Sequence, residues 1–169
     1  MLFHFLRANR AHGLEPSLLE HVLEALSDRE DVVFEFSRFE LEDIRTVLEV
    51  RTTVGRPDAI TWVDYEWFIC WELKVTASEG SDQTQRYVDV PQFNSIGLDK
   101  DDIPASGHHY IYLAPAAGEP PRTDAFLHVT WEWMATTMQD FLAESYGAYP
   151  TRTTAQLSDF IDTIKINSS

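Results

Sequence analysis

Three charged residues lie at the ends of a mostly apolar stretch of the sequence, whose middle is interrupted only by Asp64 and Glu66. Asp58 precedes one short apolar segment, and Glu72 and Lys74 end a second one, with Leu73 between them. If the chain turns at Tyr65, the two segments pair as antiparallel strands and Asp58 falls opposite Glu72, because both lie equally far from the turn. Facing residues in such a ladder point to one side, with Cβ atoms about 4.5–5.5 Å apart. The spacing therefore predicts two neighbouring carboxylates.

The alternation of side chains along a strand brings the lysine to the same place. Lys74 is two residues beyond Glu72, so both point to one face, while Leu73 points to the other, into the core. Facing carboxylates repel each other unless a proton or a cation lies between them. A divalent metal such as Mg²⁺ favours oxygen ligands and would bridge them. Lys74 could then orient or deprotonate an attacking water, a combination that fits phosphodiester hydrolysis.

The same trio also has a simpler interpretation, a solvated set of ion pairs near strand ends. The neighbouring residues favour a site instead. The segments AITWV (59–63) and FICW (68–71) are apolar on both alternations, which predicts strands in the middle of a sheet. Charged groups beside such strands are costly unless they have a function.

The remaining pattern supplies the elements that must position this hairpin. Apolar spacing predicts amphipathic helices, and alternation predicts strands. The expected elements are, in order, a helix over 15–28, strands over 31–39 and 45–54, the two hairpin strands, a helix from about Asp82 that Pro91 ends, a strand over 108–115, and helices over 131–146 and 154–166. This order predicts an α/β or α+β sandwich, a mixed sheet covered by helices on both faces.

Composition limits the class of protein. With 169 residues and 44% hydrophobic residues, we expect one folded domain over residues 1–169. No apolar run reaches the roughly 18 residues of a membrane-spanning helix. A single cysteine, Cys70, excludes an internal disulfide and a thiolate zinc cluster. Together with the lack of a signal-peptide pattern, this favours a cytoplasmic location.

The charge is strongly negative. Acids outnumber bases 28 to 13, for a net charge of −15, so the surface repels nucleic acid on average. Such a surface would suit a salt-rich cytosol, where repulsion is screened within about 3 Å at 1 M salt. An ordinary acidic protein, or a subunit with a basic partner, fits equally.

A family resemblance follows from the charged trio and its surroundings. Pro57-Asp58 and Glu72-Leu73-Lys74 resemble the two half-motifs of the PD-(D/E)XK nuclease superfamily. Gly55-Arg56 completes the GRPD form of one bacterial, archaeal and phage branch. Gln83 and Tyr87, one helical turn apart, resemble the QxxxY helix of many members.

The likeness covers most of the chain, from about Glu15 to Tyr146. It implies a restriction-endonuclease-like αβββαβ core with a mixed central sheet flanked by helices, here with extra C-terminal helices. It also implies metal-dependent cleavage of DNA or, less often, RNA.

The resemblance also implies roles for the matched residues. Asp58 and Glu72, with the main-chain carbonyl of Leu73, would bind Mg²⁺ or Mn²⁺. Lys74 would serve the attacking water, and Gln83 would help to position the site from the following helix.

Other residues are assigned more loosely. Arg56, Arg86 and Tyr87 would contact the substrate, although Tyr87 could support the site instead and Arg56 could pair with the neighbouring acid. A further catalytic acid is expected from the first helix, Glu15 or, as the alternative, Glu20. Charge on a helix surface explains both of these acids equally well.

The function we expect is a metal-dependent endo- or exonuclease that acts on DNA in preference to RNA, as a possible homodimer or with a partner protein. The alternative is a nuclease-like binding or regulatory module in a defence or repair assembly, weak or inactive alone. The intact trio favours the enzyme, whereas the acidic surface favours dependence on a partner. A structural subunit that binds metal without turnover is a third interpretation.

Overall fold

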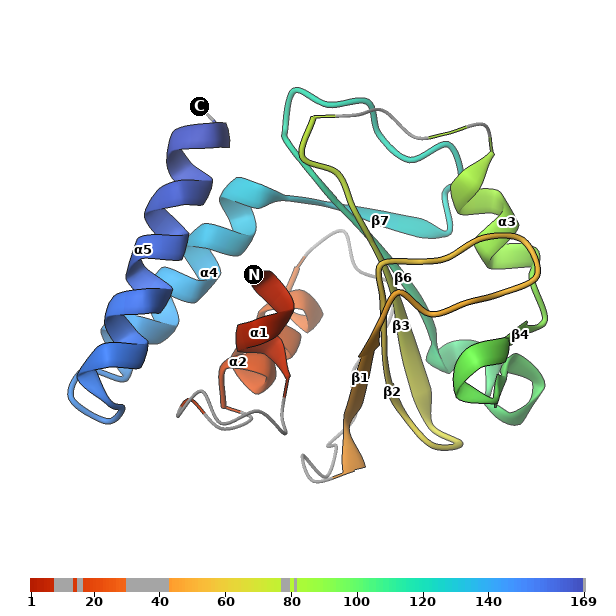
Figure 1. The fold of residues 1–169 in the computed structure, drawn as a ribbon, viewed down its shortest axis with the longest axis horizontal. Helices are drawn as coiled ribbons and strands as arrows, with labels where there is room; N and C mark the ends of the chain where they lie inside the picture. The colour runs from red at the N-terminus through yellow and green to blue at the C-terminus, as the bar shows by residue number, and fades with distance from the viewer. Residues whose placement is uncertain (8–13, 15–16, 30–42, 77–79, 81, 169) are drawn as a thin grey trace. The chain divides into compact units, whose positions relative to one another are not determined.

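The chain folds into two compact units. The structure, a computed structural model, describes residues 1–7, 14, 17–29, 43–76, 80 and 82–168. Contacts group Met1–Glu42 with Thr130–Ser169 in one unit and place Asp43–Val129 in the other (Figure 1). The expectation of one domain over residues 1–169 stays a prediction.

The first unit is helical in its described part. On α2, Leu19, Val22, Leu23 and Leu26 are buried, as the apolar spacing predicts. Thr130 caps α4, because its hydroxyl accepts a hydrogen bond from the Trp133 N–H at 3.1 Å. The helices are α1 (Leu2–Leu6), α2 (Ser17–Ser27), α4 (Trp131–Glu144) and α5 (Thr151–Ser168). The two C-terminal helices are confirmed, whereas α1 is too short to give a periodic signal.

The second unit is built on a mixed sheet of five strands in the order β1-β2-β3-β6-β7. β2 pairs antiparallel with β1 and β3, and β3 pairs parallel with β6. The hairpin strands β2 and β3 are therefore interior, as predicted. The strands are β1 (Arg45–Leu48), β2 (Ala59–Val63), β3 (Trp67–Leu73), β6 (His108–Ala114) and β7 (Phe126–Thr130). β7 was not expected from the sequence.

One face of this sheet is covered by elements of the same unit. Phe68, Cys70 and Tyr110 point to this face and pack with Tyr87 and Phe93 in one buried cluster. The covering elements are helix α3 (Gln83–Asp89), the small strands β4 (Gln92–Phe93) and β5 (Leu98–Asp99), and the short 3₁₀ turns Asn94–Ile96, Lys100–Asp102 and Ala105–Gly107. Helix α3 lies within the range predicted for it.

The register of the hairpin is the predicted one. The pairs run from Ala59 with Trp71 to Val63 with Trp67, so each pair is centred on Tyr65. Tyr65 takes a left-handed conformation, with φ of 64°. The turn is braced by Asp64, whose carboxylate accepts hydrogen bonds of 2.9 Å from both Arg45 and Trp62. The acid at this turn therefore has a structural explanation.

Strand β1 is shorter than the sequence predicts. The strand expected over 45–54 ends at Leu48, because Glu49 has φ of 52°, outside the extended region. The strand expected over 31–39 lies outside the described residues. Within the described ranges, no helix is long and apolar enough to cross a membrane.

Candidate active site

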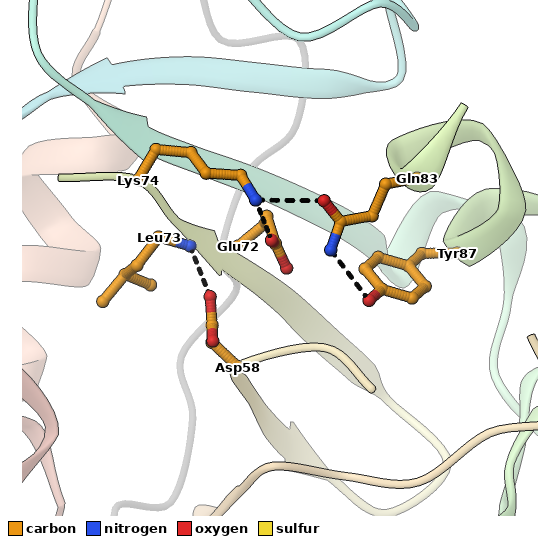
Figure 2. A network of polar contacts seen from close by, with 6 residues as sticks. All are labelled: Asp58, Glu72, Leu73, Lys74, Gln83 and Tyr87. Atoms are coloured by element: carbon orange, nitrogen blue, oxygen red, sulfur yellow. Dashed lines mark hydrogen bonds and ion pairs between the residues drawn. The ribbon is translucent and has the colours of Figure 1, made fainter. Parts of the chain in front are cut away.

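Asp58 and Glu72 both lie near the end of β3, although regular pairing stops one residue short of them. The last regular pair is Ala59 with Trp71. Asp58 stays against β3 because its N–H donates to the Trp71 carbonyl at 3.1 Å. Its carboxylate oxygen Oδ2 also accepts a hydrogen bond of 2.7 Å from the Leu73 N–H. The hairpin thus brings Asp58 to the charged end of the neighbouring strand (Figure 2).

Glu72 is a buried acid with two different oxygen atoms. The residue is only 3% exposed. Its Oε1 pairs with Lys74 Nζ at 2.7 Å, whereas Oε2 is buried and has no hydrogen-bond partner among the described residues. Burial, and after it the negative charge of Asp58, raise the pKa of Glu72, while the hydrogen bond from Lys74 opposes the shift. The site therefore holds more negative charge than its own lysine neutralises.

Lys74 joins the strand to helix α3. Its Nζ donates to Glu72 Oε1 at 2.7 Å and to Gln83 Oε1 at 3.0 Å. Its main-chain N–H donates to the Leu113 carbonyl of β6 at 2.8 Å, which holds the chain beyond the end of β3. Figure 2 shows the ammonium group between the carboxylate and the amide. The lysine is thus held at both ends.

Gln83 is oriented in turn by Tyr87. The Gln83 Nε2 donates to the Tyr87 hydroxyl at 3.1 Å, which leaves the amide oxygen for Lys74 (Figure 2). Tyr87 is 2% exposed, and burial raises its pKa, so the hydroxyl stays neutral. A Cβ on Gly55 would lie 3.0 Å from the ring of Tyr87 and 3.1 Å from its hydroxyl, so only glycine fits there without displacing it.

The structure separates the residues assigned to the substrate. Tyr87 is a buried residue of α3, a position that suits support of Gln83 rather than direct contact with a polymer. Arg86 is exposed on α3. The Arg56 guanidinium is exposed and lies 3.7 Å from Glu49, so its ion pair is with that residue and not with Asp58.

The further catalytic acid is not placed. Glu15 lies outside the described residues. Glu20 is half-buried on α2, in the first unit.

His108 and His109 point to opposite faces of β6, as their adjacency requires. His108 Nε2 meets the Lys100 and Ile103 carbonyls at 3.0 and 2.9 Å.

The donor atoms of the expected metal site are of the type that a hard divalent cation prefers. No group of three or more His, Cys, Asp or Glu side chains gathers in the described part of the chain. The expected set is smaller, two carboxylates with the main-chain carbonyl of Leu73, and all its donors are oxygen atoms, as Mg²⁺ and Mn²⁺ prefer. The unpartnered Oε2 of Glu72 supplies one buried donor.

Comparison with protein-family models, curated proteins and solved structures finds no match to this chain. Its function must therefore be inferred from the site itself.

Proposed function

We propose that this chain is a metal-dependent nuclease of the PD-(D/E)XK type, which hydrolyses phosphodiester bonds of DNA in preference to RNA. One observation carries this function. Glu72 Oε2 is buried without a hydrogen-bond partner among the described residues, and burial, with a smaller effect of the Asp58 carboxylate, raises the pKa of the same group. A buried carboxylate oxygen without a hydrogen-bond partner is costly to a fold, even when the other oxygen is paired. A cation between the two acids would remove that cost, which gives the arrangement a purpose.

Asp58 and Glu72, with the main-chain carbonyl of Leu73, would hold Mg²⁺ or Mn²⁺. When bound, such an ion polarises the phosphoryl group and makes a water molecule more acidic. The order of elements supports the family assignment, since α2, β1 to β3, α3 and β6 occur in the order of an αβββαβ core, with the small strands β4 and β5 inserted between α3 and β6.

The remaining chemistry belongs to Lys74 and its support. Its ammonium lies 2.7 Å from Glu72 Oε1 and would orient the attacking water. It would also offset the negative charge that grows on the phosphate in the transition state. Gln83 holds this ammonium in place, so the lysine needs little reorganisation when the substrate arrives.

Two exposed arginines would receive the substrate backbone. Arg56 is next to Gly55, which packs against the Tyr87 ring, and Arg86 is next to Tyr87 on α3. Their guanidinium groups are exposed and can pair with phosphate oxygens. They provide local positive charge on a chain whose net charge is −15.

The test is cleavage of single- and double-stranded DNA and RNA with Mg²⁺ or Mn²⁺, from low to molar salt. Lys74→Met should lower the cleavage rate by about 100- to 10,000-fold, the usual contribution of a group that manages a proton or a water. Lys165→Met is the matched control, because Lys165 lies on α5 in the other unit, and it should cleave like wild type. Undiminished cleavage by Lys74→Met would overturn the mechanism.

A second candidate is a nuclease-like module that depends on a partner. The net charge of −15 favours it, because a nuclease that acts alone needs a surface that attracts nucleic acid. This candidate predicts metal binding by Asp58 and Glu72 without cleavage of any of the four substrates. Metal titration by calorimetry on wild type and Asp58→Asn separates it from a chain that binds no metal.

A further inference from the structure

Lys100 is a buried lysine that lies beneath helix α3. Lys100 is 6% exposed, although the neighbouring residues Asp99, Asp101 and Asp102 suggest a surface position. Its Nζ donates to the main-chain carbonyl of Tyr87 at 2.6 Å and to that of Val88 at 3.0 Å. It makes no ion pair with an acid in the described part of the chain. Its ammonium group therefore interacts with main-chain carbonyls of the helix.

These two carbonyls belong to the last turn of α3, where no further turn can pair them. The negative end of a helix also attracts a cation. The rings of Phe93, Tyr110 and Phe68 lie 5.1, 5.2 and 5.8 Å from Lys100 Nζ, a distance at which aromatic faces stabilise a cation. Burial lowers the pKa of Lys100 to about 8, so it remains mostly charged at neutral pH. The contacts join α3 to β3 and β6.

Helix α3 needs such an attachment. It has only seven residues, too few to be stable alone. Its first turn lacks a side-chain cap, because Asp82 has φ of 51° and makes no capping hydrogen bond. Thr84 and Tyr87 are buried and hold its middle. Lys100 is the polar attachment of its last turn.

Hydrogen bonds link this lysine to the candidate site through the main chain and the side chain of Tyr87. Lys100 binds the carbonyl of Tyr87, and the hydroxyl of that residue accepts from the Gln83 amide. Gln83 then accepts from Lys74, which pairs with Glu72. A shift of α3 would therefore move the group that holds Lys74.

We propose that Lys100 is a positioning residue, which acts through the α3 backbone to hold Gln83 against Lys74. The consequence for catalysis rests on the function proposed above. The consequence for the position of Lys74 does not, and it can be measured without any cleavage.

The chain has only three lysines, Lys74, Lys100 and Lys165, so protein labelled at the lysine ¹³Cε gives three signals. Single Lys→Arg substitutions assign them. In Lys100→Met, the Lys74 signal should move away from its wild-type position, because Gln83 no longer holds the ammonium, while the Lys165 signal stays. Amide exchange over residues 83–90 should become about tenfold faster or more.

Phe93→Leu is the matched control. Phe93 is fully buried and 5.1 Å from Lys100 Nζ, but it makes neither hydrogen bond to α3. This variant should lose stability and keep the wild-type Lys74 signal. If the signal stays in place in folded Lys100→Met, or moves equally in Phe93→Leu, the proposal is overturned. If Lys100→Met does not fold, Lys100→Gln, which is neutral and one bond shorter, is measured with the same expectation.

Cleavage gives an independent reading. Lys100→Met should lower kcat by about tenfold while KM and metal affinity stay within about twofold, since neither substrate nor metal touches this residue. If the wild type cleaves nothing, the proposed nuclease fails, and the Lys74 signal still decides the role of Lys100.

Discussion

The ammonium of Lys74 lies 2.7 Å from one oxygen of Glu72, while the other oxygen of that carboxylate is buried without a hydrogen-bond partner among the described residues. Asp58, whose carboxylate accepts a hydrogen bond from the Leu73 N–H, adds a second acid at this end of the hairpin, where Lys74 is the lysine paired with Glu72. The charge of Lys74 offsets only one of the two formal carboxylate charges. The remaining negative charge would favour binding of a metal ion.

Removing the charge of Glu72 should stabilise the fold at neutral pH. Burial raises the pKa of this carboxyl above its value in the unfolded chain. Its contribution to stability is therefore complete below the unfolded value and is lost as pH rises through the folded one. We expect Glu72→Gln to melt at a higher temperature than wild type at pH 7, with the difference shrinking as pH falls through the raised folded pKa and absent below about pH 4.3. Melting followed by circular dichroism from pH 4 to 8 checks this. A lower melting temperature for the variant at pH 7 would show that the pair with Lys74 outweighs desolvation.

Metal binding should release protons just above the ordinary pKa of a glutamate. The raised pKa of Glu72 leaves part of the carboxyl protonated there, and a metal must displace that proton. Titration of Mg²⁺ or Mn²⁺ by calorimetry, in two buffers with different heats of ionisation, measures the release. The release should diminish as pH rises, and a heat that is independent of the buffer throughout would contradict the expectation.

Two aspartates of the same hairpin should respond differently to loss of charge. Asp58→Asn should weaken metal binding by at least about 10- to 100-fold, the range seen even for residues that only support a ligand. Asp64→Asn is the matched control, because Asp64 braces the turn through Arg45 and Trp62. It should cost some stability and leave metal affinity unchanged. Equal affinity in the two variants would exclude Asp58 as a ligand.

The close approach of Gly55 to Tyr87 should be sensitive to a single methyl group. A Cβ at this position would lie 3.0 Å from the ring, so Gly55→Ala must displace Tyr87 and with it the Gln83 amide. We expect a loss of about 1–3 kcal/mol in the free energy of unfolding, as for other overpacked sites, and a slower cleavage. For Gly80→Ala, the nearest atom is Gln83 Oε1 at 3.9 Å, an ordinary contact, so this variant should behave like wild type in urea unfolding and in cleavage.

The hairpin could be predicted from the sequence because the pattern that indicates it lies within one short segment of the chain. Apolar residues on both alternations indicated an interior strand pair, and the symmetry about Tyr65 set the register that β2 and β3 show. Strand β7 was not predicted because its residues do not alternate between buried and exposed. Phe126 and Val129 are buried, and the two residues between them are half-buried. The expected end of β1 was wrong because a left-handed conformation at Glu49 has no clear signature in a non-glycine residue.

What the sequence determined by itself is the gathering of Asp58, Glu72 and Lys74 on one side of a hairpin, because a period of two and a centred turn dictate which side chains share a face. Only the tertiary structure decided that one Glu72 oxygen is paired and the other is not, and that Lys100 lies buried beneath α3. Burial and the choice of partner depend on packing between segments far apart in the chain, and no local pattern of residues records that packing.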